Sequence, residues 1–313
     1  MTSSTCRSSR PAVRIRVATR GSALARWQAD SVAGLLTDVA PGIEVEIVVV
    51  LTTGDRDRTT PLEEMGGQGV FVKEVQTAVL EGRADLAVHS AKDLPGASTD
   101  GLVLAAVPER ADPRDALVGC RWVDLPVGAT VATGSIRRRA HLAHLRPDLL
   151  FVGLRGNIET RLARVSDVDA VVTAMAALDR LGLAPDIVDP LEPAVLLPQV
   201  AQGALAVECR DDDELRTLLA TIEDPSARRA VDAERAFLAE LGAGCDLPIA
   251  AHSRLLVDGS AAGGIVVTGA LSSPDGTTLL REERTGTDGT SLGRAIARHL
   301  LDDRGGAALM SVS

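Results

Sequence analysis

The sequence predicts an α/β protein that ends in a smaller α+β unit. Short apolar segments alternate with amphipathic segments of helical length through most of the 313 residues. This alternation is typical of a parallel or mixed sheet covered by helices on both faces. Near the C-terminus three strand-like segments instead follow one another between two helical ones. The length predicts two or three domains, and since only 2% of the residues are aromatic, their cores must consist of Val, Leu, Ile and Ala.

The first unit is expected to alternate regularly between strands and helices. A strand is expected over residues 13–19, and a helix follows it from Ser22. A second, apolar strand covers 43–51, an amphipathic helix covers 71–82, and a short buried strand covers 84–90. This order predicts parallel strands that are connected through helices.

A second unit follows the charged, proline-containing segment 108–116, where we expect the chain to cross between the units. Strands are expected over 129–133 and 148–154, each followed by a helix, and a further strand and helix come after them. The segments VATRGSALA (17–25) and VATGSIRRRA (131–140) are alike, because each leads from a strand end through a Gly-Ser turn into a helix. The two units are therefore predicted to have matched architectures.

The third unit is expected to start near Asp224 with a long amphipathic helix, because Asp-Pro is a typical N-cap and first turn. The loop GAGCDLP follows at 242–248. The remaining expected elements are three strands over 249–257, 263–273 and 277–286 and a final helix over 291–303. These elements predict a small α+β domain.

Charge and cysteine content argue against several classes of protein. The chain has 33 Lys and Arg against 43 Asp and Glu, and its formal charge of −10 opposes nucleic-acid binding. No apolar run approaches the roughly 18 residues that cross a membrane. The four cysteines form no C-x-x-C pair and no zinc-ligand spacing with the five histidines, which favours a reducing, cytoplasmic location. Residues 1–12 lack the apolar core of a secretory signal and are expected to be a disordered leader.

Basic residues nevertheless gather at the predicted strand ends, where α/β sheets bind ligands. Three of the four strand ends are also predicted helix N-termini, which favour anions. The residues concerned are Arg20 and Ser22, then His89, Ser90, Lys92 and Asp93, then Thr133, Ser135, Arg137 and Arg138, and finally Arg155 and Arg161. The pattern predicts a cleft for a small polyanion, and the alternative is that these residues only cap helices.

Two features within this group suggest specific roles. Consecutive helix residues are about 100° apart, so we expect Arg137 and Arg138 to face the ligand and Arg139 to face solvent. Asp93 is a carboxylate among cations. It either caps a helix or pairs with Lys92, or it stabilises a developing cation and transfers protons.

Two glycine-containing segments could contribute to the same site. GGQGVFVKE (66–74) lacks the Gly-Lys-Ser/Thr ending of a P-loop, so a hinged lid is the better interpretation. Cys245 lies in the loop GAGCDLP. A lone cysteine is usually an inert small hydrophobe, but the neighbouring glycines would permit close approach and covalent attachment of a ligand.

Taken in order, these segments resemble the porphobilinogen deaminase (hydroxymethylbilane synthase) family. The resemblance covers roughly residues 13–300, and its motifs are ATRGSALARWQ, GGQGVFVKE, ADLAVHSAKDLP, ERADPRDAL, ATGSIRRRAHL, RPDLLFVGLRGNIETRL, LPQVAQGALAVECR and ERAFLAELGAGCDLPI. It implies a transferase that condenses four porphobilinogen molecules head to tail, with release of ammonia, into hydroxymethylbilane for haem and other tetrapyrrole (porphyrin) biosynthesis. The alternative is a two-lobed module that binds a small anion without catalysis.

The resemblance also implies roles for individual residues. The family's dipyrromethane cofactor is attached by a thioether to a cysteine that matches Cys245, and its catalytic aspartate matches Asp93. The other cofactor-binding positions match Lys92, Thr133, Ser135, Arg137, Arg138, Arg155 and Gly156. The substrate-binding positions match Arg20, Ser22, Gln28, Arg155, Arg161 and Gln202. No metal is implied.

The fold implied by the resemblance has three domains in a cytoplasmic monomer. Two are doubly wound α/β domains similar to periplasmic binding proteins, and the third is a small α+β domain that carries the cofactor cysteine. The expected limits are 1–12 for the leader, 13–108 with 204–221 for domain 1, 109–203 for domain 2 and 222–313 for domain 3.

Three positions depart from the family pattern. A lysine common at the third position of the G-G-x-G loop is Gln68, and a nearby basic position is Glu64. The common T-S-S before the arginines reads Thr133-Gly134-Ser135. We expect a lid with weaker electrostatic contact to the ligand and the loss of one hydroxyl contact to the cofactor, with activity retained and elongation kinetics altered.

Overall fold

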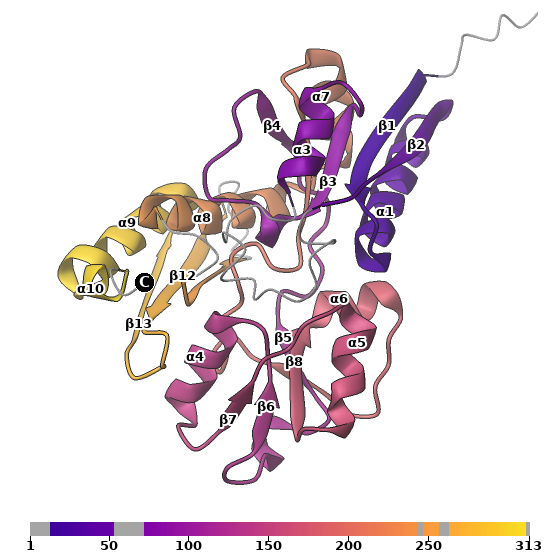
Figure 1. Ribbon diagram of the computed structural model, residues 1–313. Coiled ribbons are helices and arrows are strands. Elements are labelled where there is room, and N and C mark those ends of the chain that lie inside the picture. The colour runs from indigo at the N-terminus through magenta and orange to yellow at the C-terminus, as the bar shows by residue number, and fades with distance from the viewer. Residues whose placement is uncertain (1–12, 53–71, 243–246, 257–262, 311–313) are drawn as a thin grey trace, which may run out of the picture.

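The computed structural model describes residues 13–52, 72–242, 247–256 and 263–310. The leader 1–12, the loop around Gln68 and Cys245 lie outside these residues. Three sheets account for the described strands, two with five strands and one with three. Figure 1 shows the two larger sheets one above the other, with the third unit beside them.

The first sheet has the strand order β2-β1-β3-β10-β4. β2, β1 and β3 are parallel, and β10 runs antiparallel between β3 and β4. Its strands are β1 (Val13–Arg20), β2 (Ile43–Val50), β3 (Leu86–Ser90), β4 (Leu102–Ala106) and β10 (Leu205–Arg210). The associated helices are α1 (Ala23–Val39), α3 (Lys73–Leu80) and α7 (Asp213–Leu219). They cover apolar clusters on the sheet, one of which contains Val17, Val32 and Leu86.

The second sheet repeats this topology with the order β7-β6-β8-β5-β9. Three strands are again parallel, and β5 is antiparallel to both of its neighbours. The strands are β5 (Asp115–Val118), β6 (Thr130–Ala132), β7 (Leu150–Val152), β8 (Ala170–Ala174) and β9 (Val188–Leu191). The helices are α4 (Ile136–Leu145), α5 (Ile158–Ala163) and α6 (Met175–Leu181). The matched architecture predicted from the two Gly-Ser segments is therefore confirmed.

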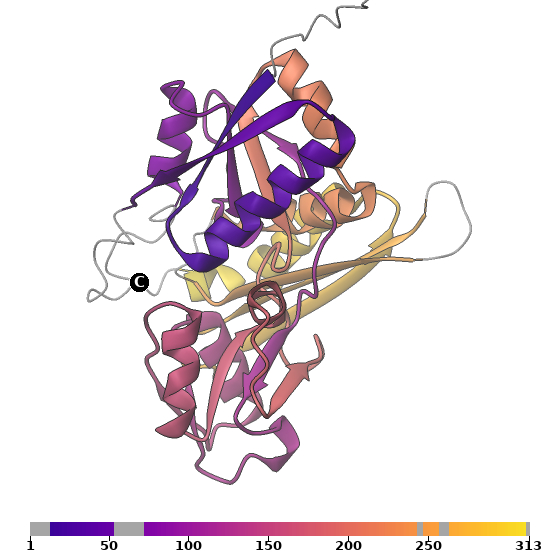
Figure 2. The same ribbon diagram turned by 90° about the vertical axis from the view of Figure 1, so that its right-hand side faces the viewer.

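The third unit is an antiparallel sheet packed against helices. Its elements are α8 (Pro225–Leu241), β11 (Ile249–Leu255), β12 (Ile265–Ser272), β13 (Leu279–Gly286), α9 (Gly289–Arg298) and α10 (Gly306–Met310). The predicted start of α8 is confirmed, because the Asp224 side chain accepts the Ala227 N–H and Pro225 occupies the first turn. In Figure 2 this unit lies behind the two larger ones, at the level where they meet.

Most predicted elements are confirmed, with bounds that differ by a few residues, but some predictions are wrong. The crossing segment ends earlier than 116, because Asp115 and Ala116 already belong to β5. The strand predicted over 43–51 is confirmed as β2, which lies at the sheet edge and is only half-buried. Strands β4, β5, β9 and β10 have no counterpart among the predicted elements. β9 is four residues long and contains Pro190, which an edge strand tolerates.

Two chain segments connect the larger sheets: 107–114 leads from β4 to β5, and 192–204 leads from β9 to β10. Because β10 lies inside the first sheet, the chain passes from the first sheet to the second and then returns. Within the described residues, no helix has the length and apolar character needed to span a membrane.

Candidate active site

The first sheet places polar residues at the carboxyl ends of its neighbouring parallel strands β1 and β3. Arg20 is the last residue of β1. Ser22 is the N-cap of α1, where its Oγ accepts a backbone N–H at 3.3 Å. Lys92 and Asp93 belong to a short 3-10 turn that directly follows β3. The strand ends thus bring two cations and one carboxylate to the same edge of the sheet.

Gln28 lies behind this group. Its side chain is buried, and its Nε2 donates to the Oγ of Ser90 at 2.8 Å. Ser90 is the half-buried last residue of β3. Gln28, which we expected to contact the substrate, therefore supports the site through Ser90 in this structure.

The second sheet contributes the turn between β6 and α4. Ser135 is the N-cap of α4, and its Oγ accepts the backbone N–H of Arg138 at 3.4 Å. Thr133 accepts the Ser135 N–H through its Oγ1 at 3.2 Å. The two hydroxyl side chains thereby define the turn from which the arginine run starts.

The neighbouring strand β7 leads to the remaining predicted cations. Arg155 follows β7, and Asn157 caps α5 by accepting the Thr160 N–H at 2.8 Å. Arg161 on α5 donates its Nε to the Gly156 carbonyl at 2.9 Å. Gly156 has a φ of +97°, and an added Cβ would lie 2.9 Å from the Thr160 methyl, so glycine is required there. Three of the four strand ends are helix N-termini, as predicted.

Arg137 and Arg138 are buried against Asp115, a fully buried residue at the start of β5. One carboxylate oxygen accepts Arg137 Nη2 at 2.7 Å, and the other accepts Arg138 Nε at 2.9 Å. Arg137 also donates to the Leu197 carbonyl at 2.6 Å. Both arginines therefore already have a protein partner, because buried guanidinium groups need a counter-charge, and their contact with a ligand stays a prediction. Arg139 is exposed, as expected.

Gln202 connects this arginine pair with Lys92 of the first sheet. It is fully buried in the second crossing segment. Its Nε2 donates to Asp115 at 3.0 Å, and its Oε1 accepts Lys92 Nζ at 3.1 Å. Gln202 is therefore a bridge between the two sheets, with its amide oxygen and nitrogen both bonded to protein groups, and its contact with the substrate stays a prediction.

Asp93 lies near the cationic side chains of Lys92 and Arg161. Among the described residues, its carboxylate has no hydrogen-bonded or salt-bridged partner, but it acts on the charges of Lys92 and Arg161. Burial lowers the pKa of Lys92 to about 8, and the charge of Arg138 contributes in the same direction. Burial, followed by Arg138 and Arg155, lowers the pKa of Arg161 to about 10. The cations from both sheets are thus close enough to repel one another.

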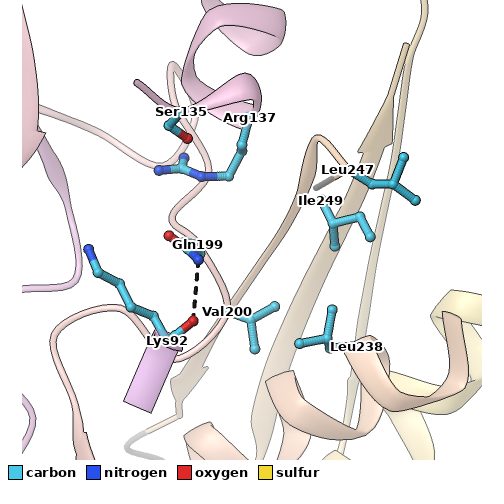
Figure 3. A pocket seen from close by; sticks show the side chains of 8 residues that line it. All are labelled: Lys92, Ser135, Arg137, Gln199, Val200, Leu238, Leu247 and Ile249. Atoms are coloured by element: carbon cyan, nitrogen blue, oxygen red, sulfur yellow. Dashed lines mark hydrogen bonds between the residues drawn. The ribbon is translucent and has the colours of Figure 1, made fainter. Parts of the chain in front are cut away.

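A small cavity of about 40 Å³ lies beside this group (Figure 3). Its polar side is formed by Lys92, Ser135, Arg137 and Gln199, and its apolar side by Val200, Leu238, Leu247 and Ile249. Gln199 Nε2 donates to the Lys92 carbonyl at 3.3 Å, which closes the polar side. Leu247 is two residues beyond Cys245 in the sequence. The cavity therefore borders cationic and polar groups on one side and apolar side chains on the other.

Asp115 is the site residue that the sequence analysis misses. It lies within the motif ERADPRDAL, where the crossing segment appeared to continue. The available signal was an acidic residue directly before a buried apolar strand, since a buried carboxylate requires partners. The described residues contain no cluster of His, Cys, Asp and Glu that could hold a metal ion.

Two models of known protein families match this chain. Residues 15–217 match the model of the porphobilinogen deaminase dipyromethane cofactor binding domain, and residues 228–302 match the model of the porphobilinogen deaminase C-terminal domain. The chain belongs to the porphobilinogen deaminase family. The predicted family is confirmed, as is the predicted fold class of two doubly wound α/β units and a small α+β unit.

Individual members of the porphobilinogen deaminase family align along almost their whole length. The porphobilinogen deaminase of Acidothermus cellulolyticus is 46% identical over 299 residues, which are 92% of this chain and 88% of the relative. That of Syntrophobacter fumaroxidans is 43% identical over 296 residues, or 92% and 94% of the two chains. That of Geobacter sulfurreducens is 42% identical over 306 residues, or 96% and 95%. The expected enzyme class and the expected dipyrromethane-binding domain agree with these matches.

Proposed function

We propose that this chain condenses four porphobilinogen molecules head to tail into hydroxymethylbilane and releases one ammonia for each. The observation that carries the proposal is the group of cations from two sheets around the carboxylate of Asp93, which has no hydrogen-bonded or salt-bridged partner among the residues that the structure describes. Family membership supports the same reaction. A two-lobed module that only holds a small anion would need neither Asp93 nor Cys245.

The cations suit the substrate because each pyrrole bears two carboxylate side chains. Guanidinium groups bind carboxylates through paired N–H donors. We assign this role to Arg20 with Ser22, and to Arg138, Arg155 and Arg161. Lys92 carries a further charge, and its proximity to Asp93 keeps the anionic chain beside the reacting ring.

Asp93 is the proposed catalytic residue. When ammonia leaves, the aminomethyl carbon of porphobilinogen becomes part of an azafulvene cation. The free α-carbon of the chain end then attacks that carbon, a C–C bond forms, and the α-proton leaves. A carboxylate beside the pyrrole N–H would stabilise the cation and accept a proton.

The chain's residues also fit a dipyrromethane bound through sulfur to Cys245. The residues around the small cavity next to Leu247 are polar on one side and apolar on the other, a combination of groups that suits contact with pyrrole rings and their carboxylate substituents. Lys92, Thr133, Ser135, Arg137, Arg138, Arg155 and Gly156 would surround it. When bound, this group supplies the pyrrole α-carbon to which the first substrate is joined.

The domain limits are part of the proposal. We assign 13–108 with 204–221 to domain 1, 109–203 to domain 2 and 222–313 to domain 3, which the grouping of strands supports. We further propose a cytoplasmic monomer that acts on a small substrate and binds no nucleic acid, in keeping with the formal charge of −10.

The test is to purify the protein from cells with an intact haem pathway and to measure its mass and its consumption of porphobilinogen. We expect an adduct of two pyrrole units, a positive Ehrlich reaction and turnover. Cys245→Ser should lose all three, whereas Cys120→Ser, a change of a half-buried cysteine beyond β5, should retain them. A wild-type protein with the mass of the bare polypeptide and no turnover would refute the proposal, and binding without turnover would favour the anion-binding module.

A further inference from the structure

Gly134 lies where the chain segments after β6 and β7 meet. A Cβ added to Gly134 would lie 2.3 Å from the carbonyl oxygen of Leu154, a distance that side-chain carbons do not reach. The preceding residue, Thr133, donates its N–H to the Val152 carbonyl at 3.0 Å. Gly134 itself is exposed to solvent, so the backbone of the neighbouring turn, and not burial, excludes a side chain.

The backbone of Leu154 cannot easily yield to such a side chain. Leu154 is 2% exposed and packs with Ala132 and Val171 in one apolar cluster. Thr133 is held to β7 by its own hydrogen bond. A side chain at position 134 would therefore push apart the turn that follows β6 and the turn that follows β7.

Each of the two turns carries cations of the site. The first leads into α4 with Arg138, and the second contains Arg155 and leads into α5 with Arg161. Arg138 and Arg155 both lower the pKa of Arg161, which shows that these like charges lie close together. Repulsion favours a wider separation, which the hydrogen bond from Thr133 to Val152 opposes, and the missing side chain of Gly134 permits the present close approach.

We infer that Gly134 is a positioning residue that sets the spacing between the Arg138 turn and the Arg155 turn, and thereby the fit of a polycarboxylated pyrrole chain. The inference rests on the proposed function. The inference also gives a structural reason for glycine at position 134, where the family pattern commonly has serine. A hydroxyl-bearing side chain is not simply missing here, because the observed approach of the turns leaves no room for one.

A pair of glycine variants on the two turns tests this inference. Gly134→Ala adds one methyl group at the contact, whereas Gly153→Ala adds one at an exposed position with no atom within 4 Å. Both holoenzymes would be checked by mass for the two-pyrrole adduct, and KM and kcat for porphobilinogen would then be measured. We expect Gly134→Ala to raise KM at least fivefold with kcat within twofold of wild type, and Gly153→Ala to change neither beyond twofold.

The separation of KM from kcat distinguishes spacing from general damage. A variant that merely folds less well has less active protein, so its apparent kcat falls while KM stays the same. Equal KM values for Gly134→Ala and Gly153→Ala, with an active wild type, would overturn the inference and leave the proposed function intact. A wild type that consumes no porphobilinogen would instead overturn the proposed function.

A second variant covers the case in which Gly134→Ala does not fold. Leu154→Ala keeps glycine at 134 but removes the side chain that anchors the Leu154 carbonyl among Ala132 and Val171. The Arg155 turn then loses its fixed distance from the Arg138 turn, and we expect KM to rise at least threefold. An unchanged KM in this variant would show that the spacing has no influence on substrate binding.

Discussion

Arg110 and Glu234 form a bidentate ion pair in the protein interior, with Nη1–Oε1 at 2.7 Å and Nη2–Oε2 at 3.0 Å. The fully buried Glu234 also accepts the backbone N–H groups of Ala201 and Ser253, each at 2.7 Å. Arg110 and Ala201 belong to the two crossing segments, Glu234 to α8 and Ser253 to β11. One carboxylate on the helix that leads to Cys245 thus holds both crossing segments to the third unit.

Arg110→Ala should destabilise the protein strongly, because it leaves the Glu234 charge buried without its counter-ion. We expect a loss of about 3–5 kcal/mol in the free energy of unfolding, measured by urea denaturation. Arg164→Ala is the control, because the pair of Arg164 with Asp167 is exposed and should contribute about 0–1 kcal/mol. Similar losses in the two variants would show that Arg110 and Glu234 do not join the units as described.

Asp93→Asn should retain the adduct on Cys245 and the wild-type melting temperature but lose nearly all condensation. The amide keeps the shape of the side chain and removes the charge that would stabilise the azafulvene cation. We expect a fall in kcat on the order of 100-fold or more, in the range typical of lost acid–base or electrostatic catalysis. The exposed Asp100→Asn serves as the matched control. Near-normal turnover by Asp93→Asn would rule out the catalytic role.

Substrate affinity should decrease as the pH rises through about 8. The folded pKa of Lys92 lies near 8, below its ordinary 10.5, so Lys92 loses its positive charge within the range of a normal assay. We expect KM for porphobilinogen to increase above this pH in the wild type. Lys92→Arg stays charged there, so its KM should not show this increase. The same increase in both proteins would assign the titration to another group.

Arg138→Ala should weaken binding of the carboxylated chain far more than Arg139→Ala. Arg138 is buried in the site, whereas its neighbour Arg139 is exposed. Loss of a charge-assisted contact costs about 1.5–3 kcal/mol, which corresponds to a roughly 13- to 160-fold increase in KM. Steady-state kinetics and the ladder of enzyme–substrate complexes on native gels would measure this. If the two variants behave alike, Arg138 serves only as a partner of Asp115.

Asp115 should contribute stability that disappears in acid. Desolvation alone would raise its pKa, but the charges of Arg137 and Arg138 outweigh it and lower the pKa from 3.8 to about 2. The contribution is therefore fully present above pH 4 and is lost as the pH falls through 2, and it amounts to about 2 kcal/mol. The difference in unfolding free energy between wild type and Asp115→Asn should shrink by this amount between pH 5 and 2. A constant difference would mean that Asp115 is not ionised in the folded protein.

The sequence by itself determined the features that depend on neighbouring residues. The strand–turn–helix order, the caps at Ser22 and Ser135 and the Asp224 start of α8 follow from local periodicity and from side chains that reach the next turn. The exposure of Arg139 follows from helix geometry alone. The cations at the strand ends were also predictable, because parallel strands in one sheet end at the same edge.

Only the tertiary structure decided which partners these residues have. Asp115 bonds to Gln202, which is 87 positions away, and Glu234 bonds to Arg110 over 124 positions. No local pattern encodes such pairs, because they arise when β10 returns to the first sheet and brings both crossing segments together. The restriction at Gly134 has the same origin, since the atom that excludes a side chain there belongs to Leu154 on the neighbouring turn.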